Sequence, residues 1–171
     1  MTARIDPRSL ALREFMARFG AVFESSPWVA EAAFAAGLPA DADHAGGLHR
    51  ALCAALRAAP DDRKLALIQA HPDLAGRLAR AGALSADSTR EQAGAGLDRL
   101  SEQEFEKFTA LNAAYKEKFA MPFVLAVKGR SKTEVLAAFA ARLGNDRETE
   151  VATALAQIER IALLRLRDLL P

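Results

Sequence analysis

Apolar residues recur along this chain at the three- and four-residue spacing of amphipathic helices. One long run is Phe105, Phe108, Leu111, Tyr115 and Phe119, whose side chains fall on one face of a helix. Comparable runs precede Pro60 and fill the C-terminal part of the chain. The pattern predicts an all-α fold with about eight helices.

Polar capping residues predict where these helices begin. Ser88–Glu91, Ser101–Glu104 and Ser131–Glu134 have the spacing of a capping box, in which serine and glutamate side chains each bind a free backbone amide. Further helix starts are expected at Ser9, Ser26-Pro27, Asp61 and Asn145–Glu148, and a helix is also expected over Asp73–Ala81.

One segment departs from the helical period. Met121–Val127 is a short apolar run, rich in aromatic and β-branched residues, between an expected helix and Lys128-Gly129-Arg130. A single strand has nothing to pair with in a helical protein. We therefore expect a buried extended connection, whose backbone polar groups need partners that a polar ligand could supply.

His71 is the histidine whose position the sequence defines best. The preceding helix should end before Pro72, since proline disfavours helical geometry in the residue before it, and Pro72 suits the first position of a new helix. His71 is therefore expected at a corner between helices, with its imidazole able to point into a cleft. A purely structural histidine at a kink explains the same local sequence.

The length and composition of the chain exclude some classes of function. A chain of 171 residues is long enough for one domain, so residues 1–171 are expected to form a single domain. Its 23 basic and 22 acidic residues are well mixed, which provides no electrostatic case for binding nucleic acid or a membrane surface. No apolar run resembles a signal peptide or a membrane span, and we expect a cytoplasmic protein.

Few groups suggest metal or thiol chemistry. Cys53 lies in an apolar run and is expected to be a buried thiol. His44 and His49 are five residues apart, which does not place two metal ligands on one helix face. No metal site and no cofactor site are predicted.

Several polar groups could nevertheless form a binding site. A helix beginning at Ser88 would attract a carboxylate or amide ligand through its free N–H groups, and an arginine such as Arg160 or Arg165 could hold a carboxylate. Each has a structural explanation as well: Glu91 as a cap residue, Gln92 as a solvated helix residue, and both arginines as surface ion-pair partners. The residues alone predict a helical protein with a histidine-centred polar cleft.

Longer motifs identify a family. In chain order they are His71-Pro72-Asp73-Leu74-Ala75-Gly76, Ser88-Thr89-Arg90-Glu91-Gln92-Ala93-Gly94-Ala95-Gly96-Leu97, Leu111-Asn112-Ala113-Ala114-Tyr115, Pro122-Phe123-Val124 with Lys128-Gly129-Arg130, Asn145-Asp146-Arg147-Glu148 and Leu164-Arg165-Leu166. With these motifs the chain resembles the decarboxylases that act on 2-oxo-4-hydroxy-4-carboxy-5-ureidoimidazoline (OHCU) in purine catabolism. The family usually has phenylalanine where this chain has Met121.

The resemblance implies a cofactor-free, all-helical enzyme, commonly a homodimer, that converts this ureido-imidazoline to (S)-allantoin and CO2. It implies that His71 is the catalytic acid and base and that Glu91 holds His71 or the substrate hydroxyl. The implied substrate-binding residues are Pro72, Ser88, Thr89, Arg90, Glu91, Gln92, Phe123, Val124, Leu125, Ala126, Val127 and Arg165, with Arg160 as the alternative arginine.

Two other functions are compatible with the same residues. One is a non-catalytic helical module that binds a small ureido ligand or a partner protein. The other is a hydrolase acting on a related ureide, which would release ammonia or urea in place of CO2.

Overall fold

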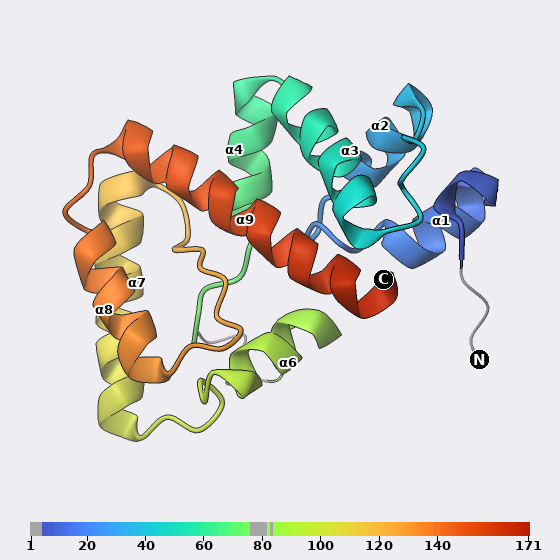
Figure 1. Ribbon diagram of the computed structural model, residues 1–171. Helices are drawn as coiled ribbons and strands as arrows, with labels where there is room; N and C mark the ends of the chain where they lie inside the picture. Colours follow the sequence, from blue (N-terminus) through green and yellow to red (C-terminus); the bar gives the residue numbers. More distant parts are fainter. Residues whose placement is uncertain (1–4, 76–81, 83) are drawn as a thin grey trace. The chain divides into compact units, whose positions relative to one another are not determined.

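The computed structural model is built from α-helices, as the sequence predicts (Figure 1). It describes residues 5–75, 82 and 84–171. Within those residues there are eight α-helices and one short 3-10 helix, and no strand. The chain divides into two compact units, one formed by residues 1–70 and 158–171 and the other by residues 71–157.

The first unit contains the N-terminal helices and the end of the last one. Its elements are η1 (Pro7–Ser9), α1 (Leu12–Phe19), α2 (Trp28–Ala36), α3 (Ala45–Ala58), α4 (Asp61–Gln69) and the C-terminal part of α9 (Arg147–Leu169). Phe15 of α1 and Phe34 of α2 pack with their ring centroids 4.9 Å apart. Leu48, Leu52 and Leu56 of α3 are buried at the spacing expected from the sequence.

The second unit contains α6 (Ala86–Gly94), α7 (Glu102–Phe119), α8 (Lys132–Arg142) and the beginning of α9. Its core is aromatic: Tyr115 of α7 meets Phe139 of α8 edge-on at 5.9 Å, and Phe123 from the connecting segment stacks on Phe139 at 3.8 Å. These rings join α7 and α8 to the irregular segment between them.

Two of the expected capping boxes are confirmed. Ser101 and Glu104 exchange side-chain bonds with each other's backbone amides at the start of α7, and Ser131 and Glu134 do the same at the start of α8. The Ser131 amide and hydroxyl hold the pKa of Glu134 below its usual value, because they bind its ionised form.

The third expected capping box, Ser88–Glu91, is wrong. Helix α6 begins three residues earlier, and Ser85 caps it by accepting a hydrogen bond from the Ser88 amide at 3.1 Å. Ser85 and Ser88 are both good capping residues, and Ala86 and Asp87 suit a first helical turn, so the earlier start satisfies the cap and lengthens the helix. Ser88 and Glu91 are therefore helical residues.

Two other expected helix bounds differ. The first α-helix begins at Leu12, because Pro7–Ser9 form a separate 3-10 turn capped by Asp6. Asp73 is not helical, Leu74 and Ala75 form a turn, and Ala75 has a left-handed φ of 51°. The rest of the helix expected over Asp73–Ala81 lies outside the described residues. No helix within the described ranges is long and apolar enough to cross a membrane.

Candidate functional site

His71 lies two residues after the end of α4, which stops before Pro72 as the sequence predicts. The expectation that Pro72 begins a new helix is wrong, because Pro72 and Asp73 are not helical. The helix stops at Gln69, Ala70 closes it, and His71-Pro72 continue without helical structure. The imidazole is partly buried, and its Nε2 atom is shielded from solvent. This is a location in which an imidazole can meet a bound molecule while its backbone is constrained by proline.

The turn after His71 is held by side chains from two helices. From α6, Gln92 Oε1 accepts a hydrogen bond from the Ala75 amide at 2.9 Å, and Gln92 Nε2 donates to Asp73 O at 3.4 Å. From α7, Asn112 Nδ2 donates to Leu74 O at 2.9 Å and Lys116 Nζ pairs with Asp73 Oδ2 at 2.6 Å. These bonds fix the backbone of residues 73–75, which directly follows His71 and Pro72.

Helix α6 turns a face that carries two of the predicted site residues toward the protein interior. Ser88 and Gln92 are four residues apart and both are buried, while Glu91 beside them is partly buried. Thr89 and Arg90 are exposed: the Thr89 hydroxyl donates to Ser85 O, and Arg90 pairs with Asp87 on the same helix. The structure therefore groups Ser88, Glu91 and Gln92 but not the side chains of Thr89 and Arg90.

The segment from Met121 to Val127 is buried and non-helical throughout, as predicted. Side chains supply partners for part of its backbone. Arg142 Nη1 donates to Val124 O at 2.6 Å, Gln157 Oε1 accepts from the Ala126 amide at 3.0 Å, and Arg130 Nε donates to Ala126 O at 3.1 Å. Residues of α8, α9 and the following turn thus define the course of this segment.

A buried carboxylate lies behind the segment. Glu150, in the first turn of α9, is 0% exposed, and its oxygens accept hydrogen bonds from Tyr115 Oη at 2.6 Å, Arg142 Nε at 2.5 Å and Asn145 Nδ2 at 3.0 Å. Burial and the hydrogen bond to Glu150 raise the pKa of Tyr115, so the phenol remains a donor. We call Tyr115, Arg142, Asn145 and Glu150 the Glu150 cluster.

The two candidate arginines differ in their surroundings. Arg165 is buried in the first unit, where Nη1 lies 3.0 Å from Glu24 Oε2 and 3.3 Å from Val22 O. Arg160 is exposed. The surface ion pair considered for Arg165 is thus wrong, because the pair is buried and ties α9 to the chain that follows α1.

The remaining thiol and histidines show no reactive arrangement. Cys53 is buried, as expected, and burial raises the pKa of its thiol to about 12. His49 Nε2 lies 3.2 Å from Cys53 Sγ and 2.7 Å from Glu159 O, while His44 is exposed beside Asp43. Among the described residues, no three His, Cys, Asp or Glu side chains gather as metal ligands would.

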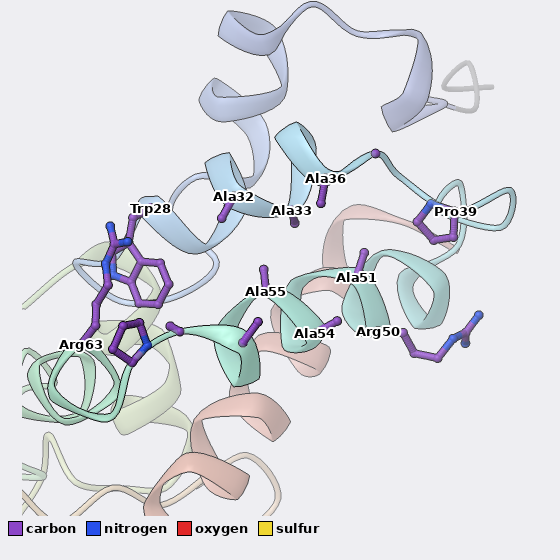
Figure 2. Close-up of a pocket in the computed structure, with 14 residues that line it drawn as sticks. Trp28, Ala32, Ala33, Ala36, Pro39, Arg50, Ala51, Ala54, Ala55 and Arg63 are labelled. Atoms are coloured by element: carbon purple, nitrogen blue, oxygen red, sulfur yellow. The ribbon is translucent and has the colours of Figure 1, made fainter.

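A pocket of about 710 Å³ lies between α2 and α3 in the first unit (Figure 2). Its wall is mostly alanine, and at one end the Arg63 guanidinium covers the Trp28 ring at 4.1 Å from the ring centroid. None of the predicted site residues lines this pocket. Its walls offer little polar chemistry with which to act on a substrate.

Sequence reasoning missed several residues that organise the candidate site: Asn112, Lys116, Arg142, Glu150 and Gln157. Three of them could have been found from the sequence, because they occupy positions of the helical repeat that are otherwise apolar. Asn112 shares a face with Phe108 and Tyr115, Arg142 follows Val135 and Phe139, and Glu150 precedes Ala154 and Ile158, all of which are buried. A polar residue at an apolar position of the period indicates a buried hydrogen-bonding role.

Comparison with protein families gives one match along nearly the whole chain. The model of the family described as OHCU decarboxylase matches residues 8–167. That range contains all of the second unit, most of the first unit and every predicted site residue.

Individual proteins agree with the family match. The chain is 43% identical to the uric acid degradation bifunctional protein PucL of Bacillus subtilis over 88% of its own length, although it spans only 29% of PucL. It is 39% identical to the 2-oxo-4-hydroxy-4-carboxy-5-ureidoimidazoline decarboxylase of Haloferax volcanii, over 90% of this chain and 88% of that protein. A crystal structure of (S)-allantoin synthase superposes with a TM-score of 0.74 and 31% identity, over 96% of this chain and 53% of that one.

Proposed function

Because the chain belongs to the OHCU decarboxylase family, we propose that it converts OHCU to (S)-allantoin and CO2 in urate degradation, with His71 as general acid and base. The match over residues 8–167 supports the reaction. The observation that supports the role of His71 is its location: a partly buried imidazole on a turn fixed by Gln92, Asn112 and Lys116.

The substrate can carry out much of this chemistry itself. The carbon that loses CO2 also bears a hydroxyl and adjoins a ring C=N bond. When the bond to the carboxylate breaks, its electron pair moves into the ring and displaces the C=N pair onto the ring nitrogen, which takes up a proton from water. The hydroxyl then loses its proton as a carbonyl forms, and the carbon of the former C=N bond gains a proton. The net uptake of one proton balances the charge of the carboxylate that leaves as CO2. The protein must orient the substrate and move two protons, and imidazole, which titrates near neutrality, suits both transfers.

We assign Glu91 to holding His71 or the substrate hydroxyl. The structure favours this assignment over the capping explanation, because Ser85 caps α6 and Glu91 lies in the second turn. Its side chain is partly buried next to Gln92, which contacts the turn after His71. A carboxylate in this place can orient an imidazole and stabilise its protonated form.

Substrate contacts are assigned to Pro72, to the Ser88–Gln92 stretch and to the Phe123–Val127 backbone. Both atoms of the Gln92 amide already bind the turn, but an amide oxygen can accept two hydrogen bonds and an amide nitrogen can donate two. In an extended chain, the polar groups of alternate residues point to opposite sides. Because protein side chains bind Val124 and Ala126, we assign the amides of Leu125 and Val127 to the substrate carbonyls.

Other parts of the proposal rest on the family resemblance. Arg165 is our candidate for the substrate carboxyl, and this role must operate beside its ion pair with Glu24. A homodimer, a cytoplasmic location and activity without a cofactor remain predictions. The single domain predicted over residues 1–171 also remains a prediction.

The test uses OHCU prepared freshly by hydrolysing the product of urate oxidation. The wild-type protein should accelerate CO2 release and yield optically active allantoin, whereas His71→Ala should keep its helical circular dichroism and lose measurable turnover. His44→Ala, at an exposed histidine, is the matched control and should behave as wild type. Normal turnover by His71→Ala would refute the role of His71.

The same assay separates the alternative functions. Racemic allantoin formed at the uncatalysed rate would favour a binding module. Ammonia or urea released in place of CO2 would favour a hydrolase.

A further inference from the structure

We propose that Arg142 is a positioning residue for the decarboxylation, and that its anchored guanidinium fixes the Phe123–Val124 backbone that leads into the Leu125 and Val127 amides assigned to the substrate. This inference rests on the proposed function, because it takes the Phe123–Val127 segment as a wall of the substrate site. Arg142 itself is not assigned a contact with the substrate.

Arg142 makes three different contacts from the end of α8. Its Nη1 donates to Val124 O at 2.6 Å, and its Nε and Nη2 atoms both lie 2.5 Å from Glu150 Oε1. The guanidinium carbon lies 4.3 Å from the centroid of the Phe123 ring. One planar group therefore holds a backbone carbonyl and covers the adjacent side chain, while a carboxylate prevents it from rotating.

The Glu150 cluster provides a rigid anchor. A fully buried carboxylate is stable only when its charge is paired and its lone pairs are hydrogen bonded. Glu150 meets this condition through Tyr115, Arg142 and Asn145, which come from α7, α8 and the turn before α9. Because these partners come from different parts of the second unit, the position of Glu150, and of Arg142 with it, is determined by the packing of that unit.

The Phe123 side chain is held as firmly as the backbone beside it. Phe139 stacks on Phe123 with the rings 12° from parallel and 3.8 Å apart. Since Phe139 occupies one face of that ring, the Arg142 guanidinium covers the other. The ring is thus sandwiched, and Val124 O, one residue along, accepts from the same guanidinium.

Stability alone does not require this arrangement. Replacing a buried ion pair with apolar side chains of similar volume is often neutral or stabilising. An apolar pair could still pack against Phe123, but it cannot donate to Val124 O. The ionic arrangement gives the Val124 carbonyl, and the amides that follow it, one defined position. This position matters because a displacement of about 1 Å at a substrate-positioning group can lower a reaction rate by about 100-fold.

The decisive variant removes the buried polar groups together. In Tyr115→Phe/Arg142→Met/Glu150→Leu, the phenol, the guanidinium and the carboxylate are all replaced by apolar groups of similar size, which avoids leaving an unpaired buried charge. We expect a folded protein with cooperative unfolding, a kcat/KM for OHCU at least tenfold below wild type, and a lower enantiomeric excess of (S)-allantoin. The enantiomeric excess is measured at an enzyme concentration that makes the uncatalysed, racemic reaction negligible. Under that condition it reports how the substrate is held, and a change in stability alone would not alter it.

A matched control removes an ion pair in the other unit. Arg57→Met/Glu159→Leu abolishes bonds of 2.9 and 2.6 Å between a guanidinium and a carboxylate, and it should retain the wild-type kcat/KM and enantiomeric excess. Arg142→Lys provides a second measurement, because it keeps the charge that Glu150 needs while losing the planar fork. We expect it to fold and to show part of the loss in kcat/KM.

The outcomes distinguish this proposal from the proposed function. If wild type makes no (S)-allantoin from OHCU, both are overturned. If wild type is active and the triple variant matches it in kcat/KM and enantiomeric excess, only the role of Arg142 is overturned. Should the triple variant fail to fold, Arg142→Lys decides: wild-type kinetics and enantiomeric excess would overturn the role, and a loss of both in a folded protein would support it.

Discussion

Gln92 Oε1 accepts a hydrogen bond from the Ala75 amide at 2.9 Å, and this contact joins α6 to the turn after His71. Ala75 has a φ of 51°, in the left-handed region that costs a residue with a side chain about 1 kcal/mol. The turn is therefore held by bonds from outside its own backbone, and Gln92 is buried where water cannot replace it.

Replacing Gln92 by leucine should weaken both the fold and the turnover. The Ala75 amide would lose its partner in a buried environment, which costs about 1–3 kcal/mol. We expect urea denaturation to show a loss of this size and kcat to fall as His71 loses its fixed backbone. Gln103→Leu, at an exposed position in the first turn of α7, is the control and should change neither quantity.

The Arg165–Glu24 pair allows a structural role to be separated from a substrate role. Arg165→Met leaves a buried carboxylate unpaired and should cost about 3–5 kcal/mol of unfolding free energy. Adding Glu24→Leu should restore most of that stability. If Arg165 binds the substrate carboxyl, the stable double variant will still show a raised KM for OHCU.

Wild-type kinetics in the Arg165→Met/Glu24→Leu variant would show that Arg165 is structural. Arg160→Met would then decide whether the reserve candidate binds the carboxyl. Since Arg160 is exposed, its replacement should change stability by less than about 0.5 kcal/mol, and any loss of turnover could be attributed to the substrate.

Cys53 should be unreactive and should make stability depend on alkaline pH. Its thiol pKa is raised from 9.0 to about 12, chiefly by burial, so the unfolded chain loses this proton at a lower pH than the folded one. The free energy of unfolding should therefore fall as pH rises from about 9 towards 12. Cys53→Ala should show a shallower decline, and an aromatic disulfide reagent at pH 8 should label wild type only after unfolding.

Met121→Phe should change little, although it introduces the residue usual in the family. Met121 is buried, and an exchange between apolar side chains of similar volume usually costs less than about 1.5 kcal/mol. We expect kcat/KM within twofold of wild type. A larger change in the rate of (S)-allantoin formation would show that this residue shapes the substrate site.

Local sequence predicted the helices well where one signal was clearly stronger than its neighbours. Ser101 and Ser131 each precede a helix with a glutamate at the correct spacing, and both form the expected capping boxes. The start of α6 was misplaced because Ser85 and Ser88 are both competent caps, and the choice between them depends on what the helix packs against.

The candidate site was predicted less completely than the fold. The corner at His71 and the irregular course of Met121–Val127 follow from proline and from the break in helical period. Most partners of these segments come from distant parts of the chain. Gln92, Asn112 and Lys116 hold the turn after His71 from 17 to 43 residues away. A local sequence pattern can show that a polar residue lies on an apolar helix face. It cannot predict which distant residue that side chain will bind.

By itself, the sequence determined that this chain folds into helices, where most of them begin and end, and that it belongs to a decarboxylase family. The sequence predicts these features because they depend on local effects: the helical repeat, helix capping and the geometry of proline all involve residues only a few positions apart. Only the tertiary structure decided that Glu150 and Arg142 meet beneath Val124 and that Arg165 pairs with Glu24, because burial selects partners for buried charges from distant segments.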